Sequence, residues 1–236
     1  MLDFDFEPQL PAWAKKLAVF DLETTGLDLA TARIVTATVA TINQSGEVEM
    51  LKEWLVNPGI EIPQAASDVH GVTTEIARER GQEPEAAISE IVQLLSELNT
   101  EVPLVAFNAP YDFTILKYEA ERYSQAGLRP KPVIDPLVLD RKLDKWRKGK
   151  RNLGLMSENY GVKLEDAHNS TADAVAAGLI AQALARKYTE LAIDALELHD
   201  LQAAWSDEWS ESFADHLRKQ NRPDYQAELG WPIRIS

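Results

Sequence analysis

Two acidic side chains stand at the end of a short apolar segment near the beginning of the chain. Residues 17–22 read as a buried strand, and Asp21 and Glu23 lie two residues apart where it ends. Side chains alternate along a strand, so both carboxylates project from the same face. Carboxylates emerging from an apolar core repel each other, and a bound cation relieves that repulsion. All-oxygen ligands favour Mg²⁺ or Mn²⁺ over zinc, although an Asp-x-Glu pair alone also suits an ordinary solvent-facing strand end.

Two further segments place polar groups at the boundary of an element. Asn108 follows the apolar residues 104–107, and Pro110 marks a helix start that puts Asp112 in the first turn. An acid in a first turn also suits the helix dipole by itself. Farther along, Asn169 or Ser170 is a plausible N-cap of a helix over 174–185, which places Asp173 in its first turn.

His168 lies just before that helix, in the same short segment as Asp173. A lone histidine is more often an ordinary surface or core residue than a catalyst. Here it accompanies a fourth acid, and three separate segments now offer acids at strand ends or helix starts. A sheet that brought these ends together would form one site.

The spacing of apolar residues predicts such a sheet. β-branched and apolar runs predict strands over 17–22, 33–41, 47–56, 103–107 and 132–134. Helical spacing predicts helices over 85–98 and from 110 to about 123. Three strands with short connections, followed by alternating helices and strands, indicate an α/β fold with a mixed sheet flanked by helices.

The ordered set of motifs resembles a known family. Asp-x-Glu-Thr-Thr-Gly at 21–26, Asn-x-x-x-Asp at 108–112 and His-x-x-x-x-Asp at 168–173 are similar to the histidine branch of the DEDD exonuclease superfamily. This DnaQ-like branch (DEDDh) includes the proofreading epsilon subunit of bacterial DNA polymerase III. The resemblance covers about 17–187, with further matches at 69–73 and 160–162. It implies a ribonuclease H-like five-stranded exonuclease domain over 1–190 and a helical C-terminal extension over 191–236.

The resemblance also implies roles for individual residues. It makes His168 the general base, and two Mg²⁺ or Mn²⁺ ions would be held by Asp21, Glu23, Asp112 and Asp173. Thr24 and the neighbouring backbone would hold the terminal nucleotide with Leu27 beside its base, and His70 and Asn108 would line the same pocket. The chain departs from the family pattern at Phe107, often a histidine, and at Ser170, more usually an alanine. Both departures concern the lining of the pocket.

The implied activity is 3′→5′ hydrolysis of single-stranded DNA to nucleoside 5′-monophosphates. An RNA-directed exonuclease of the same superfamily fits the same residues, because none of them reads the 2′-hydroxyl unambiguously. A polymerase-associated proofreading or interaction subunit that docks a DNA polymerase or another replication or repair protein through its C-terminal segment is a different class of function. A catalytically inactive binding module is disfavoured, because all five expected residues are present.

The charge distribution bears on a nucleic-acid partner in two ways. A formal net charge of −14 argues against one, whereas the segment Arg141–Arg151 holds seven Lys/Arg, one acid and Trp146. This segment reads either as a solvated helix end or as a phosphate-contacting loop. The chain has no cysteine, which excludes disulfides and a thiolate zinc site. No run approaches the roughly 18 apolar residues of a membrane span, no signal peptide is visible, and a cytoplasmic protein is expected.

The C-terminal segment is rich in tryptophan. Residues 192–220 have a helical pattern that sets Trp205 and Trp209 four residues apart on one face, and Trp231 follows in a segment with prolines. Exposed tryptophans at this density would favour aggregation. We therefore expect the extension to pack on the body of the protein.

Overall fold

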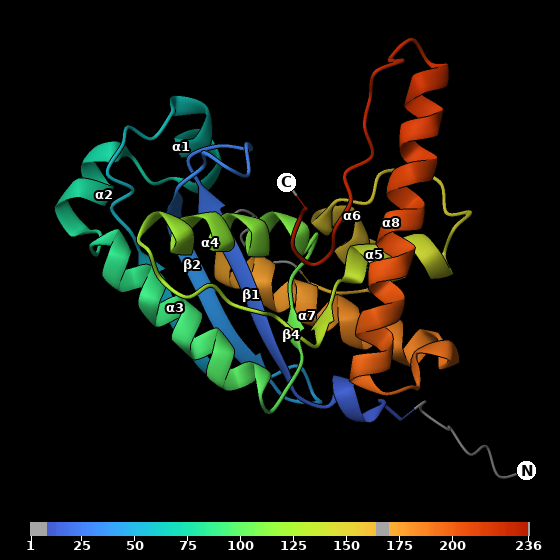
Figure 1. The fold of residues 1–236 in the computed structure, drawn as a ribbon. Coiled ribbons are helices and arrows are strands. Elements are labelled where there is room, and N and C mark those ends of the chain that lie inside the picture. Colours follow the sequence, from blue (N-terminus) through green and yellow to red (C-terminus); the bar gives the residue numbers. More distant parts are fainter. Residues whose placement is uncertain (1–8, 164–169, 236) are drawn as a thin grey trace, which may run out of the picture.

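The computed structural model describes residues 9–163 and 170–235, and its centre is a mixed five-stranded sheet (Figure 1). The order of the strands is β3-β2-β1-β4-β5. β1, β2 and β3 form an antiparallel meander, and β4 and β5 run parallel to β1. Their bounds are Leu17–Thr24, Ile34–Ile42, Val48–Leu55, Leu104–Val105 and Val133–Ile134. The predicted fold class, a mixed five-stranded sheet flanked by helices, is confirmed.

Among the described residues, the four longest helices, α3, α4, α7 and α8, lie where the sequence pattern predicts them. The first helices are η1, α1, α2, α3 and α4, at Ala12–Ala14, Gln64–His70, Thr74–Arg80, Pro84–Asn99 and Pro110–Arg122. The later ones are α5, α6, α7, η2 and α8, at Pro136–Leu143, Leu153–Tyr160, Ser170–Lys187, Thr189–Leu191 and Ala195–Lys219. The short helices α1 and α2 were not predicted, because seven residues give too few turns for a periodic pattern. None of the helices in the described residues is long and apolar enough to span a membrane.

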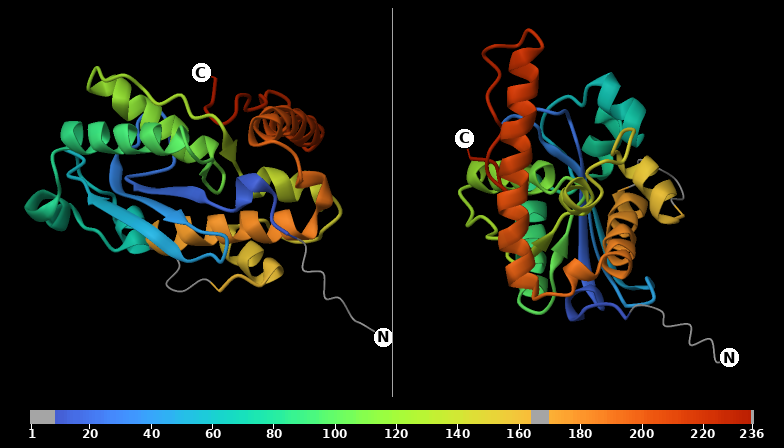
Figure 2. Two further views of the ribbon diagram at one scale, coloured as in Figure 1. Left: turned by 90° about the horizontal axis from the view of Figure 1, so that it is seen from below. Right: turned by 90° about the vertical axis from the view of Figure 1, so that its right-hand side faces the viewer.

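The helices form a layer on each face of the sheet (Figure 2). Ala18, Phe20 and Leu22 belong to the apolar cluster that includes residues of α3 and α4. Leu17 and Val19, the alternate residues of β1, belong to the cluster that includes residues of α7. Period-two alternation along β1 thus supplies both cores.

α7 approaches the sheet closely. A Cβ atom added to Gly178 would come within 2.6 Å of Val19 and 2.7 Å of Ile42. Glycine therefore allows the helix to lie directly against β1 and β2. The helix that carries Asp173 is fixed relative to the strand that carries Asp21 and Glu23.

The C-terminal helix α8 lies beside β5, the strand at one edge of the sheet. The Val133 backbone N–H donates to Nδ1 of His199 (3.0 Å), and Gln202 Nε2 donates to the Val133 carbonyl (3.0 Å). The Asp135 backbone N–H donates to Gln202 Oε1 (2.7 Å). An uncovered edge strand invites pairing with other chains, and here side chains of α8 occupy its polar backbone groups. The division predicted at residue 190 stays a prediction.

Candidate active site

Asp21 and Glu23 project toward α7. They continue the alternation of Leu17 and Val19, which pack in the α7 cluster, and both are partly buried. Their partners across the antiparallel pair are Thr38 and Thr36 of β2. β1 therefore delivers the two carboxylates to the end of the sheet on the face that α7 covers.

Asp112 reaches the same strand from α4. β4 ends at Val105, so β1 extends beyond its parallel neighbour. The backbone N–H of Leu22 donates to Asp112 Oδ1 at 3.1 Å, and the Asp112 side chain is buried. As predicted, Asp112 lies in the first turn of α4, with Pro110 as the first helical residue.

Asp173 lies in the first turn of α7, and the start of this helix is tied to the sheet. The hydroxyls of Thr38 and Ser170 are 2.8 Å apart and hydrogen-bonded, and the hydroxyl of Thr171 donates to Glu53 of β3. Ser170, where family members more often have alanine, thus contributes a contact that alanine lacks. The start of α7 cannot shift along the sheet without breaking these bonds.

The four acids act on one another electrostatically. Burial raises the pKa of Asp21 well above its usual value, and the negative charges of Asp112, Glu23 and Asp173 raise it further. Burial and then the charge of Asp173 raise the pKa of Glu23 to about 7. The pKa of Asp112 is also raised well above its usual value, chiefly by burial. Asp21 of β1 therefore lies within the electric field of Asp112 from α4 and of Asp173 from α7.

The donor set suits hard divalent cations. Carboxylate oxygens are the ligands that Mg²⁺ and Mn²⁺ prefer, and positive charge among these groups would offset both burial and mutual repulsion. Within 9–163 and 170–235, no three acidic or histidine side chains are already arranged as a closed ligand set. The fit therefore rests on the chemistry and mutual field of the four acids, and their assignment as metal ligands stays a prediction.

The raised pKa values predict how stability depends on pH. An acid whose pKa is higher in the folded protein than in the unfolded chain, where it is about 4, keeps its proton on folding. The stability of the fold therefore falls as the pH rises from the unfolded pKa to the folded pKa, which is about 7 for Glu23. Without metal, we expect the melting temperature to drop by several degrees between pH 5 and pH 8. Excess Mg²⁺ should restore more stability at pH 8 than at pH 5, as measured by differential scanning calorimetry.

The variant Glu23→Gln provides the control for that experiment. Its amide cannot ionise, so the melting temperature should depend less on pH than in the wild type. Carboxyls with lowered pKa values, such as Glu90 at about 2, lose their contribution to stability only below about pH 4.5. They therefore do not affect the melting temperature between pH 5 and pH 8. A wild-type melting temperature that is flat from pH 5 to pH 8 would contradict the prediction.

The loop after β1 is held by two hydroxyl groups. Thr24 Oγ1 lies 2.6 Å from the Tyr111 hydroxyl, and both lie within hydrogen-bond distance of the Gly26 carbonyl, at 2.8 and 2.9 Å. The two hydroxyl protons are shared among these three contacts. Because Tyr111 belongs to α4, the contacts hold the Gly26 carbonyl against that helix. The next side chain, Leu27, is 85% exposed. An exposed leucine on a fixed loop is suited to contact a flat apolar group, and the predicted roles of Thr24 and Leu27 stay predictions.

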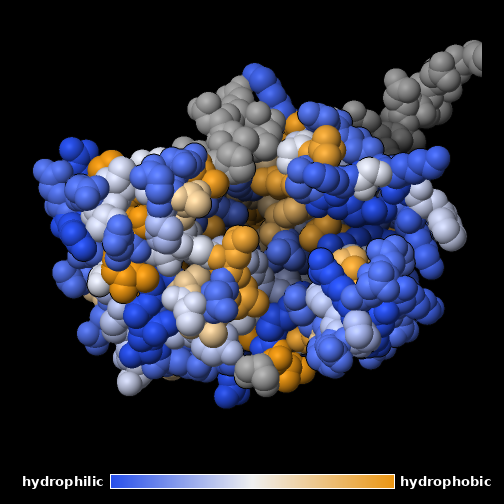
Figure 3. All heavy atoms as spheres, turned by 90° about the horizontal axis from the view of Figure 1, so that it is seen from above, coloured by the Kyte–Doolittle hydropathy of each residue, from blue (hydrophilic) through white to orange (hydrophobic). Residues whose placement is uncertain are grey.

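His70 lies beside Glu23, and Asn108 lies in the turn before α4. His70, the last residue of α1, lines a hollow of about 400 Å³ together with Glu23, Trp54 and Ser170. Its Nδ1 accepts from the Val72 backbone, and burial lowers its pKa. Asn108 is exposed before α4 with a φ of +61°. From the side toward which β1 points in Figure 1, the molecule has a hollow in the middle of this face (Figure 3).

His168, the predicted general base, lies outside the described residues. The segment that the structure describes resumes at Ser170, the first residue of α7. Asp173 is three residues into that helix. The role of His168 therefore stays a prediction from the motif.

Asp135 is a buried acid that the sequence analysis did not single out. Its Oδ1 accepts from the backbone N–H groups of Asn108 and Leu137 at 3.0 and 2.9 Å, and its Oδ2 accepts from Ala109 N at 3.0 Å and Trp231 Nε1 at 3.3 Å. It thereby ties the C-terminal segment to the turn that starts α4 and positions Asp112. The available sequence signal was local: an Asp directly before Pro136 is a typical N-cap.

We expect Asp135→Asn to destabilise the protein by about 2–3 kcal/mol, because an amide NH₂ would face backbone donors in a buried site. Trp231→Phe removes only one of the four donors and should cost about 1 kcal/mol. Urea unfolding monitored by circular dichroism would measure both free energies. Equal effects of the two variants would show that the backbone contacts of Asp135 do not stabilise the start of α4.

Comparison with known proteins places this site in a family. Residues 18–180 match the sequence family described as RNase_T, exonuclease, which covers more than half of the chain. The chain belongs to the DnaQ-like exonuclease family. Among curated relatives of this exonuclease, the PolC-type DNA polymerase III of Streptococcus mutans serotype c (strain ATCC 700610 / UA159) is 30% identical over 160 residues. That match takes in 68% of the chain and 10% of the polymerase, so the chain spans about a tenth of this relative.

Solved structures of exonucleases share the fold. The zinc-bound form of the E. coli exonuclease I–ssDNA complex is 18% identical, with a TM-score of 0.64 over 75% of this chain and 42% of that one. The nuclease domain of 3′hExo, a DEDDh family member bound to rAMP, is 14% identical, with a TM-score of 0.62 over 73% of this chain and 92% of that one. The second comparison shows that almost an entire nuclease domain has its counterpart here.

Proposed function

We propose that this exonuclease hydrolyses single-stranded DNA from its 3′ end and releases nucleoside 5′-monophosphates with the help of two divalent cations. The observation that supports this most directly is the mutual field of the four acids, contributed by β1, α4 and α7. Family membership supplies the reaction class, and the exonuclease I neighbour, solved in complex with ssDNA, supports the substrate. Direction, product and metal number are parts of the proposal.

The acids of the site are proposed to act together on the terminal phosphodiester. Asp21, Glu23, Asp112 and Asp173 would hold Mg²⁺ or Mn²⁺, which when bound activates water and offsets negative charge on the phosphate and the leaving 3′-oxygen. The fixed strand and helix ends position these carboxylates before substrate arrives, so little reorganisation accompanies the reaction. Asp21 is affected by the charges of the three other acids and is therefore proposed to be the central ligand.

His168 is proposed to take the proton of the attacking water on its imidazole. An unperturbed imidazole has a pKa of about 6.5, which allows it to act as a base at neutral pH. Its sequence position, five residues before Asp173, connects it to the start of α7. The motif alone supports this role.

The residues around the acids are proposed to bind the terminal nucleotide. The fixed loop after β1 would present its backbone beside Thr24 to the sugar and phosphate, and Leu27 would lie against the base. His70 and Asn108 approach from α1 and from the turn before α4. The hollow lined by His70 and Glu23 is of a size to admit part of a nucleotide.

The proposal is tested with 5′-end-labelled single-stranded DNA and RNA of identical sequence, with and without Mg²⁺ or Mn²⁺. We expect a ladder of products that shortens from the 3′ end, dependence on the divalent ion, and nucleoside 5′-monophosphates by chromatography. A label released first as a mononucleotide would show attack at the 5′ end and would refute the proposed direction. Activity that persists in EDTA would refute the metal dependence.

An RNA-directed exonuclease is the second candidate. The 3′hExo nuclease domain, solved bound to rAMP, matches this fold over nearly all of its own length. The matched oligomers decide between the two: faster degradation of RNA than of DNA would favour this candidate. Polymerase relatives also support a third possibility, a partner DNA polymerase, which co-purification with full-length and tail-truncated protein would test.

A further inference from the structure

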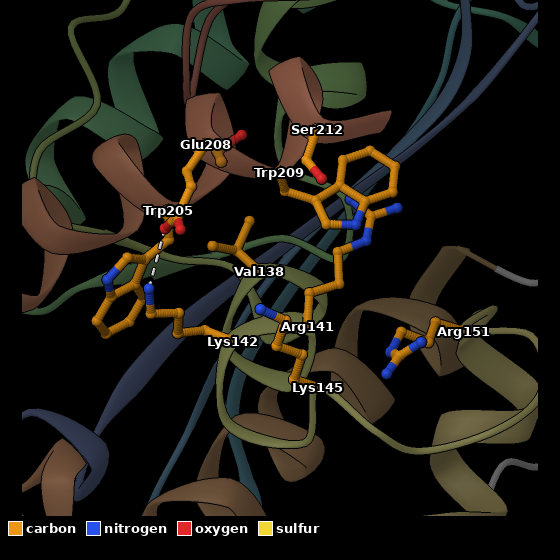
Figure 4. Close-up of a pocket in the computed structure, with 10 residues that line it drawn as sticks. Val138, Arg141, Lys142, Lys145, Arg151, Trp205, Glu208, Trp209 and Ser212 are labelled. Atoms are coloured by element: carbon orange, nitrogen blue, oxygen red, sulfur yellow. Dashed lines mark hydrogen bonds and ion pairs between the residues drawn. The ribbon is translucent and has the colours of Figure 1, made fainter. Parts of the chain in front are cut away.

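A pocket of about 330 Å³ lies between α5, the basic segment after it and α8, apart from the four acids (Figure 4). Four cationic side chains and two indole rings contribute to its lining: Arg141, Lys142, Lys145, Arg151, Trp205 and Trp209. Glu208 is the only acid among the lining residues. In a chain of net charge −14, this concentration of positive charge requires an explanation.

Several cations of the basic segment have partners within the protein. Asp140, which is fully buried, accepts from Arg147 at 2.8 Å and from Arg151 at 2.6 Å. Lys142 pairs with Glu208 at 3.0 Å. The segment is therefore not a uniformly solvated loop, because part of it is anchored to α5 and α8.

Arg141 differs from these neighbours. Within the described residues it has no hydrogen bond and no ion pair, and its guanidinium lies 3.5 Å from the centre of the Trp209 ring. Phe213 stacks on Trp209 as well, with ring centres 4.9 Å apart. Figure 4 shows the guanidinium beside the indole, at the pocket. The planar guanidinium carries its N–H groups at its edges, so contact with a ring face leaves these groups able to donate to the oxygens of a phosphate.

The charge of Arg141 is poorly compensated where it lies. Burial lowers its pKa to about 10, and the charges of Arg151 and Arg234 add to this effect against those of Asp135 and Asp140. A partly desolvated cation beside other cations is costly unless an anion joins it. Lys145 lines the same pocket from an exposed position, so two cations without a carboxylate partner face one space.

From these contacts we infer that the pocket binds a backbone phosphate of the single-stranded substrate, a short distance from the 3′ end that the acids cleave. This inference rests on the proposed function. α5 begins after Asp135, the residue that holds the turn before Asp112, and Arg141 lies six residues farther along, a rise of about 9 Å. A strand that leaves the acids along α5 therefore passes the pocket.

The inference predicts a specific loss of strand binding. We expect Arg141→Gln/Lys145→Gln to weaken binding of a fluorescent 20-nucleotide strand at least fivefold, measured by anisotropy in EDTA so that no hydrolysis occurs. The slope of log K against log salt should shrink by about 0.7, the value for one phosphate contact to a single strand. The matched control is Arg129→Gln/Lys219→Gln, which removes one arginine and one lysine from exposed positions elsewhere. We expect the control to change affinity by less than twofold.

Three variations distinguish the possible outcomes. Lys145→Gln alone, at an exposed position, should still weaken binding about twofold even if the double variant folds poorly, and Arg141→Lys should retain part of the affinity. Thymidine 5′-monophosphate, at concentrations that fill the pocket, should displace the labelled strand only weakly. The reason is that the strand also contacts the site formed by the four acids.

Equal losses in the pocket and control variants would overturn the inference, since only net charge would then matter. Equal binding of the mononucleotide and the strand would also overturn it, in favour of a free nucleotide as the ligand. A wild-type protein that binds the strand but releases no nucleotide with metal would refute the proposed function and leave the pocket supported.

Discussion

Replacing Asp21 by asparagine should abolish exonuclease activity while making the metal-free protein more stable. Loss of solvent and the charges of the other three acids raise the pKa of Asp21, so its negative charge opposes folding. The neutral amide removes that cost, and we expect a rise of a few degrees in melting temperature at pH 8. The same change removes the proposed central metal ligand, so the rate should fall at least about 10³-fold.

The response to metal separates this explanation from simple misfolding. Mg²⁺ at about 100 times its dissociation constant should stabilise the wild type by about 2.7 kcal/mol and the variant much less. Asp200→Asn is the control, because Asp200 is an exposed acid on α8 that pairs with Lys131 at the surface. It should alter neither the rate nor the response to metal. An active Asp21→Asn enzyme would remove Asp21 from the site.

Replacing His168 by alanine should lower turnover by roughly 10²–10⁴-fold and leave metal binding largely intact. The reason is that the imidazole is proposed to accept a proton, whereas the four carboxylates carry the metal ions. In the wild type the rate should decline at acidic pH as the imidazole becomes protonated, and the variant should lack this decline. Single-turnover rates on a labelled strand between pH 5.5 and pH 8.5 would measure both effects.

His216→Ala provides the matched control for this second prediction. His216 lies in the last turn of α8 at an exposed position, so its loss should leave the rate within twofold. Mg²⁺ titration followed by the melting temperature should give the same curve for His168→Ala and the wild type. An unchanged rate in His168→Ala would exclude the histidine from the mechanism.

Local sequence determined the elements and the order of the site residues. The apolar run over 17–22 predicted a strand, and the two-residue spacing of Asp21 and Glu23 predicted that its acids share a face. Pro110 predicted the helix start that carries Asp112. These features depend on contacts between near neighbours, which is why they can be read from spacing. The order of the three motifs was specific enough to indicate the exonuclease family.

Only the tertiary structure decided which distant residues act on one another. Asp135 ties Trp231 to the start of α4 across almost a hundred residues, and the Thr38–Ser170 hydrogen bond fixes α7 on β2. The same holds for the basic segment. Its composition left a solvated loop and a phosphate-binding loop open, and the packing of α8 places Arg141 against Trp209 with no ion pair among the described residues. Such pairings depend on how helices dock on the sheet, and the free energy of docking is spread over many side chains that no local pattern records.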